Sequence, residues 1–209
     1  MNQLPEIVKQ YLEPIGIKEG TEIYQLIEIG FEYAPYIGKV IQSIKMHRFG
    51  LRLKENSRQI EEIQRLLLDT KLDRRFIQER VFPIVLDDLI EDHEDQKIHY
   101  ILSGLTAILN EYATEESEIL LFYDTLRALR IYDLQYLGKF DMTEGTLVAE
   151  YTRDFVNVPA IDVGVINKLE RLGIIRTQAA FLFGDDKKDV HEDRLILTTY
   201  GKRFLEFLK

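Results

Sequence analysis

The chain contains no cysteine and no tryptophan, and it has only five prolines and three methionines. Without cysteine, disulfides, thiolate metal sites and cysteine nucleophiles are all excluded. This composition is compatible with a reducing cytoplasm, where we expect the protein to reside. No apolar run approaches the roughly 18 residues that a membrane-spanning helix needs, and Pro5 and Glu6 interrupt the region where a signal peptide would carry its apolar core. We therefore expect neither export nor a membrane partner.

The apolar content is nevertheless sufficient for a folded core. Hydrophobic residues make up 45% of the chain, and 11 Phe and 11 Tyr compensate for the missing tryptophan. Together with 30% charged residues, this composition excludes wholesale disorder. A length of 209 residues exceeds one typical domain and suits an elongated body with a small appended module.

The formal charge of −9 is distributed unevenly along the chain. Residues 39–80 hold eleven Lys or Arg against six acids, whereas residues 87–118 hold ten acids and only Lys97. Two neighbouring segments of opposite charge are expected to pair within the fold or between two copies of it. A nucleic-acid stripe is the alternative interpretation of the basic residues Lys45, Arg48, Arg52, Lys54, Arg58 and Arg65. Glu55, Glu61 and Glu62 interrupt that stripe, which favours the pairing.

Helical periodicity dominates residues 1–114, which we expect to form an all-α body. Its helices are predicted over Asn2–Glu13, from Thr21 to Pro35, over about Tyr36–Leu68, over Arg74–Asp92 with a kink at Pro83, and over Gln96–Tyr112. A further helix after Thr114 begins a second region, 115–209, which includes an irregular connection at about 134–160. The predicted fold is therefore mainly α, with a long helix hairpin and a small α+β module at the C-terminus.

The predicted long helix carries an apolar seam with alternating spacings of four and three residues, typical of a packed or coiled pair of helices. Such a helix would be near 50 Å long, so a partner helix must cover it. We expect a homodimer or another protein to use this face, although a helix of the same chain would satisfy it equally. The candidate partner face consists of Phe49, Leu53, Ile60, Ile63 and Leu67.

The last part of the chain reads as helix, strand, loop, strand and helix. The first helix ends at Gly173, strands are predicted at Ile174 and over Arg194–Thr198, and the closing helix begins at Thr199. The segments LxxLGII and LTxxGxxFLxFL within residues 161–209 resemble many winged-helix proteins. The resemblance implies a recognition module, and modules of this kind contact either DNA or protein.

A DNA reader would present basic or amide side chains on its recognition helix. Asn167, Lys168 and Arg171 meet that requirement, and Lys187, Lys188 and Arg194 would assist them from the wing. However, Asp162 and Glu170 lie among the first three, and residues 184–194 carry five acids against three bases. Such a surface approaches phosphates at an electrostatic cost, so protein contact is favoured over DNA.

The acidic run contains Asp88, Asp92, Asp95 and His99 at spacings of four, three and four residues, which would suit a divalent cation if one helix presented them all. The alternative, a solvated face of an amphipathic helix, is favoured. Neither a Gly-x-Ser-x-Gly elbow, a His-Glu-x-x-His pair nor a Walker-type loop occurs. We predict a non-enzymatic protein without metal or cofactor, and a metal-dependent hydrolase is the least favoured alternative.

Three short stretches of the N-terminal region carry a second resemblance. They are Tyr11-Leu-Glu-Pro-Ile-Gly, Pro35-Tyr-Ile-Gly and Lys45-x-x-Arg-Phe-x-x-Arg-Leu, which resemble small bacterial proteins of the abortive-infection alpha type. The resemblance implies a bacterial or prophage protein that acts through protein contacts in phage resistance or regulation. A DNA-binding transcriptional regulator remains the alternative.

Overall fold

The structure of the protein is a computed structural model that describes residues 4–33, 39–140, 146–148, 159–181 and 191–209. The chain divides into two compact units. Unit 1 comprises residues 1–128 and 207–209, and unit 2 comprises residues 129–206. The described residues are mainly helical, with a small antiparallel sheet in unit 2, which confirms the predicted fold class. Among them, no helix is both long and apolar enough to cross a membrane.

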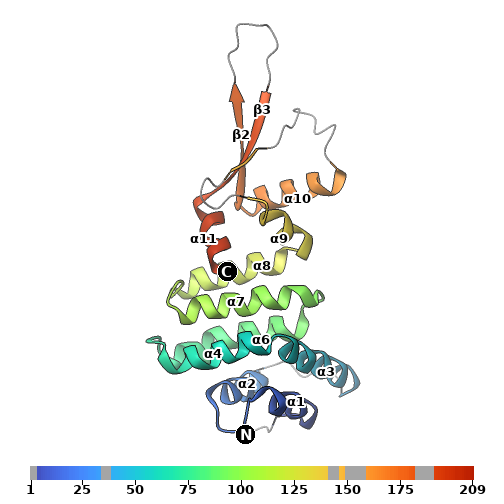
Figure 1. Ribbon diagram of the computed structural model, residues 1–209, viewed down its shortest axis with the longest axis vertical. Helices are drawn as coiled ribbons and strands as arrows, with labels where there is room; N and C mark the ends of the chain where they lie inside the picture. The colour runs from blue at the N-terminus through green and yellow to red at the C-terminus, as the bar shows by residue number, and fades with distance from the viewer. Residues whose placement is uncertain (1–3, 34–38, 141–145, 149–158, 182–190) are drawn as a thin grey trace. The chain divides into compact units, whose positions relative to one another are not determined.

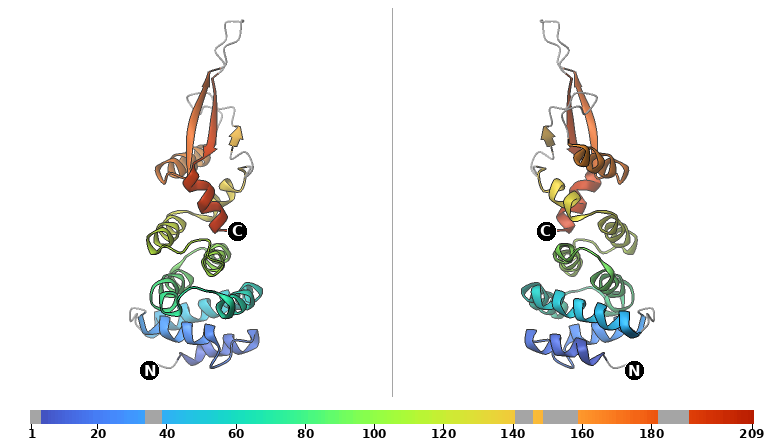
Figure 2. Two further views of the ribbon diagram at one scale, coloured as in Figure 1. Left: turned by 90° about the vertical axis from the view of Figure 1, so that its left-hand side faces the viewer. Right: turned by 90° about the vertical axis from the view of Figure 1, so that its right-hand side faces the viewer.

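Unit 1 is a stack of helices (Figure 1), and its most extensive packing joins helices that are not consecutive in the chain, such as α1 with α3 and α4 with α7. Helices α7 and α8 lie side by side and are seen nearly end-on in Figure 2. The elements of unit 1 are α1 (Glu6–Leu12), η1 (Glu13–Ile15), α2 (Glu22–Tyr33), α3 (Lys39–Glu55), α4 (Ser57–Asp69), α5 (Arg74–Phe76), η2 (Ile77–Val81), α6 (Phe82–Glu91), η3 (Asp95–Lys97), α7 (Ile98–Leu109) and α8 (Glu116–Ala128).

The boundary between the units lies one helix later than the predicted division at residue 114. Helix α8 belongs to unit 1 because its apolar face is buried there, and the Tyr123 hydroxyl donates to the Ile101 carbonyl at 3.1 Å. The Phe207 ring also packs in unit 1, with its centroid 4.7 Å from that of Phe122. Gly104 leaves room for this ring, since a Cβ there would lie 2.6 Å from Phe207 Cζ.

The predicted long helix is divided into two helices. Asn56, with φ −105° and ψ 26°, separates α3 from α4, and its side-chain amide donates to the Arg52 carbonyl at 2.8 Å. Asparagine readily makes such local side-chain bonds, which compete with the helical hydrogen-bond ladder. The apolar seam passes through the break, so both shorter helices bury it inside unit 1.

The predicted kink near Pro83 takes the form of a π-helical turn. This turn, η2, lies directly before α6, in which Pro83 occupies the first turn. Proline has no backbone N–H, and the first turn of a helix is where the loss of that donor is tolerated. The chain from Arg74 to Glu91 therefore continues in helical form around the proline.

The described residues of unit 2 form three helices and a three-stranded antiparallel sheet. Its strands follow the order β1-β3-β2, and β2 and β3 pair from Ile175 opposite Leu197 to Phe181 opposite His191. The short strand β1 lies within the predicted irregular connection at about 134–160, whose first residues belong to the helix α9. The elements are α9 (Ile131–Leu137), β1 (Thr146–Val148), α10 (Ala160–Arg171), β2 (Ile175–Phe181), β3 (His191–Leu197) and α11 (Thr199–Phe207), whose last residue is assigned to unit 1 (Figure 1).

The predicted termination of α10 at Gly173 is confirmed. Gly173 has a φ of 70°, a conformation that glycine adopts without steric cost, and the Ile174 N–H donates to the Leu169 carbonyl at 3.0 Å. Close to this turn, the Thr198 hydroxyl donates to the Gly173 carbonyl at 2.6 Å, and it accepts a hydrogen bond from the Gly201 N–H at 2.9 Å and so caps α11.

Replacing Gly201 by alanine should destabilise the protein by about 1–3 kcal/mol, the usual cost of overpacking. A Cβ at this position would lie 2.0 Å from the Ile174 carbonyl oxygen, which is backbone and already accepts the Thr198 N–H. The matched control is Gly164→Ala in α10, where a Cβ meets nothing within 4 Å, so helix propensity should raise stability by about 0.5–1 kcal/mol. Urea unfolding of both variants checks the prediction, and equal effects would contradict it.

Candidate functional site

The basic and acidic segments of unit 1 meet along one side of α3. Lys45 pairs with Glu91 at 2.5 Å, and both Arg48 and Arg52 pair with Asp95, at 2.9 Å and 2.8 Å. The predicted electrostatic pairing is therefore intramolecular and links α3 to the end of α6 and to η3. These three basic residues of the predicted nucleic-acid stripe are occupied within the chain.

Arg52 forms the centre of this network, and only 1% of it is exposed. Its guanidinium donates to the carbonyls of Leu89 at 2.6 Å and Asp92 at 2.5 Å, and to the Asp95 carboxylate. The last carbonyls of a helix have no intrahelical partner, so Arg52 satisfies the C-terminus of α6. Burial lowers the pKa of Arg52, while Asp95 opposes that shift.

The four residues weighed as metal ligands do not share one helical face, because α6 ends at Glu91, before Asp92. Each has a partner in the protein. Asp92 pairs with the buried Lys97 at 2.8 Å, and His99 Nδ1 lies 3.0 Å from Gln59 Oε1. Within the described ranges, no group of three or more His, Asp or Glu residues could hold a metal ion.

Asp88 is a buried carboxylate that the sequence interpretation placed on a solvated face. Its Oδ1 accepts from Arg127 Nε at 2.5 Å, while Oδ2 has no hydrogen-bond partner among the described residues. Burial raises the pKa of Asp88 from 3.8 to about 6, although Arg127 opposes the shift. An imperfectly satisfied buried charge of this kind disfavours the ionised form.

The predicted partner face is not accessible in this structure. All five of its side chains are buried inside unit 1, so the intramolecular alternative that the spacing left open accounts for them. A partner would have to use other residues. The buried set is Phe49 and Leu53 on α3, and Ile60, Ile63 and Leu67 on α4.

The candidate DNA-contacting residues of α10 differ in availability. Asn167 and Arg171 are exposed, but the Lys168 ammonium pairs with Asp133 Oδ2 of α9 at 2.6 Å. Arg194 lies on β3, opposite Gln178 of β2. Lys187 and Lys188 lie outside the described residues.

The two acids of α10 are tied to neighbouring elements of unit 2. Asp162 Oδ1 accepts the Tyr132 hydroxyl at 2.7 Å, and Glu170 accepts the Thr177 N–H at 2.8 Å as well as its hydroxyl. These bonds hold α9 and the start of β2 against the helix. Both carboxylates therefore lie close to any ligand that binds α10.

The outer side of α10 carries an exposed aliphatic side chain. Ile161 is 58% exposed, and Tyr132 of α9, which is 38% exposed, donates its hydroxyl to the adjacent residue Asp162. Gly164, Asn167 and Arg171 follow along the exposed side of the helix. Tyr132, Ile161, Gly164, Asn167 and Arg171 are called the α10 face below.

Comparison of the whole chain with protein-family models, with curated proteins and with solved structures finds no match. The arrangement of its own residues is therefore the basis for assigning a function.

Proposed function

We propose that this is a non-enzymatic interaction protein that binds another protein through the α10 face of unit 2. The observation that carries the proposal is Ile161, an aliphatic side chain that is largely exposed on a well-anchored helix. Tyr132 and Arg171 accompany it, and aromatic residues and arginine are enriched where proteins meet. The partner would offer an apolar recess for Ile161 and a carboxylate for Arg171.

The charge of α10 favours protein over DNA as the ligand. Lys168 is held by Asp133, so Arg171 is the exposed cation of the helix, while Asp162 and Glu170 remain negative. A protein that reads DNA neutralises several phosphates with its own cations. DNA reading through Asn167, Lys168 and Arg171 is the alternative, and it predicts a steep dependence of binding on salt.

The topology of unit 2 supports a winged-helix module. The sheet order β1-β3-β2, with α10 directly before the β2–β3 hairpin and α11 after it, fits the order of elements that the resemblance implies. Such a module would serve protein contact in this chain. A bacterial or prophage origin, a cytoplasmic location and a role in phage resistance or regulation complete the proposal.

The substitution Ile161→Arg should abolish binding of the partner, because it places a charge in the apolar centre of the contact. Leu68→Arg is the matched control, since Leu68 is an aliphatic side chain of α4 in unit 1 that is 70% exposed. We expect the same partner to co-purify from native cells with the wild type and with Leu68→Arg, and at least tenfold less with Ile161→Arg. Mass spectrometry with isotope labels measures the ratio.

Equal recovery of every co-purifying protein with both variants would refute the proposal. The DNA alternative is tested separately by fluorescence anisotropy with random and genomic duplexes at low salt. If the duplexes bind at micromolar protein, and if this binding weakens with added salt and with Arg171→Ala, the α10 face contacts DNA and the proposal of a protein partner is refuted.

A further inference from the structure

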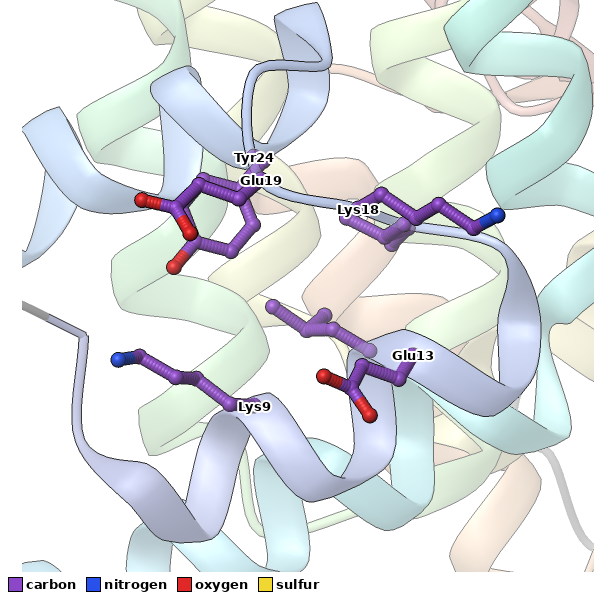
Figure 3. Close-up of a pocket in the computed structure, with 7 residues that line it drawn as sticks. Lys9, Glu13, Lys18, Glu19 and Tyr24 are labelled. Carbon is purple, nitrogen blue, oxygen red and sulfur yellow. The ribbon is translucent and has the colours of Figure 1, made fainter.

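A cavity of about 400 Å³ lies in unit 1 between α1, η1 and the segment that leads into α2. Figure 3 shows the side chains that surround it. This volume falls in the range of about 300–1,000 Å³ that is usual for small-molecule sites. The lining residues are Lys9, Leu12, Glu13, Ile17, Lys18, Glu19 and Tyr24.

The segment around the cavity is held by its own turn contacts. Gly16 has a φ of 82° and ends η1, after which the Ile17 N–H donates to the Leu12 carbonyl at 3.0 Å. The Thr21 hydroxyl then donates to the Lys18 carbonyl at 2.8 Å before α2 begins. Leu12 and Ile17 are fully buried, so they form an apolar base beneath charged walls. The cavity is thus built from ordered backbone.

Tyr24 contributes a polar group without a partner. Only 5% of this residue is exposed, and its hydroxyl makes no hydrogen bond with any residue that the structure describes. Burial raises the pKa of Tyr24, so the phenol stays neutral at physiological pH. Tyr24 lines the cavity, so a ligand bound there can reach its hydroxyl. In Figure 3 this hydroxyl lies between the Glu19 carboxylate and the Lys9 ammonium.

The free charges at the cavity are mainly negative. The Lys9 ammonium pairs with Glu6 at 2.9 Å, and the Lys18 ammonium points away on the far side (Figure 3). Glu13 and Glu19 form no ion pair with any residue of the described ranges. Their carboxylates lie on different sides of the cavity in Figure 3. Two separated acceptors therefore face a partly apolar space.

We propose that this cavity binds a small organic cation, specifically a linear alkyl diamine. Its two ammonium groups would donate to Glu13 and Glu19, and the Tyr24 oxygen would accept a further hydrogen bond from the one at Glu19. The methylene chain would lie over the base formed by Leu12 and Ile17 and along the Tyr24 ring, where a nearby cation is also favoured. An aliphatic chain with a charge at each end matches this arrangement in both shape and charge.

The test titrates 1,5-diaminopentane into the full-length ¹⁵N-labelled protein and follows amide chemical shifts. We expect saturable shifts at Ile17, Glu19 and Tyr24, which line the cavity. The one-charge compound 1-aminopentane should bind at least about threefold more weakly, since each exposed ion pair contributes little. Pentanoate should not bind. Equal affinity for 1-aminopentane and the diamine, or binding of pentanoate, would overturn the proposal.

Substitutions of the lining residues test whether the diamine binds in this cavity. Glu13→Gln with Glu19→Gln should weaken binding about tenfold, and Tyr24→Phe should weaken it about threefold without loss of the buried ring. Glu62→Gln removes an exposed carboxylate of α4 in the same unit and should leave affinity unchanged. Amide spectra of the unligated variants verify that each is folded. No shift at 10 mM diamine, or shifts that all variants share equally, would refute the site.

Discussion

Replacing Arg52 by methionine should lower the free energy of unfolding by about 3–5 kcal/mol, the usual cost of removing one partner from a buried charged network. Methionine fills much of the volume of the aliphatic stem, so the loss arises from polar groups left unpaired. The carbonyls of Leu89 and Asp92 would lose their donor at the C-terminus of α6, and Asp95 would lose one of its two cations.

Arg48→Met is the matched control, because Arg48 pairs with the same Asp95 but is considerably more exposed. Its cost should not exceed about 1 kcal/mol, as expected for a surface ion pair. Arg52→Lys should recover little of the loss, because an ammonium does not provide the planar fork that reaches several acceptors. Urea unfolding at pH 7 measures all three variants. A loss below 1 kcal/mol for Arg52→Met would show that the network is not structural.

The buried carboxylate of Asp88 should make the protein more stable as the pH falls from 7 to 4.5. Its pKa is about 6 in the folded state and near 3.8 in the unfolded chain, so folding favours the protonated form. The stabilisation is fully present below the unfolded pKa and is lost as the pH rises through 6. Over this window the change amounts to about 2 kcal/mol.

Asp88→Asn isolates this contribution, because asparagine does not titrate. The stability difference between wild type and variant should shift by about 2 kcal/mol in favour of the wild type between pH 7 and pH 4.5. Asp92 and Asp95 have lowered pKa values, so their stabilisation is lost only as the pH falls below about 4. A difference that is independent of pH, or that shifts the opposite way, would show that Asp88 ionises normally.

The charge network could be predicted only in part from the sequence. Segregation of basic and acidic segments correctly indicated that they pair, since oppositely charged helices of one body attract. It could not show which charges are buried. The spacing of the charged residues from apolar ones does indicate which charges are buried. Arg52 follows the buried Phe49 by three residues and Asp88 follows the buried Val85 by three, which places both on apolar helix faces.

Periodicity identified buried residues better than it identified what covers them. Phe49, Leu53 and Ile60 have the spacing of a helix seam, and they are buried as that spacing requires. The same spacing serves a partner in the same chain or in another, and in this structure helices of the same chain cover the face. Asn56 separates α3 from α4 and so divides the predicted long helix. Its side-chain hydrogen bond to the Arg52 carbonyl is a local polar contact, which a pattern of apolar residues does not reveal.

The order of elements in unit 2 was predictable because its ends carry strong local signals. Gly173 and Thr198 mark the end of α10 and the cap of α11 through contacts within a few residues of each. The pairing of Lys168 with Asp133 was not predictable, since the two residues lie on different helices and meet only in the folded unit. That contact nevertheless changes the choice of ligand, because it occupies a cation that DNA reading would need.

The central claim, that the α10 face binds a protein, is tested most directly by photo-crosslinking in native cells. A benzophenone amino acid is placed at position 161 in one strain and at the comparably exposed position 68 in another. We predict one dominant crosslinked protein from position 161 that is absent from position 68 and disappears when Arg171→Ala is added. Crosslinks to nucleic acid from position 161, or identical products from both positions, would contradict the claim.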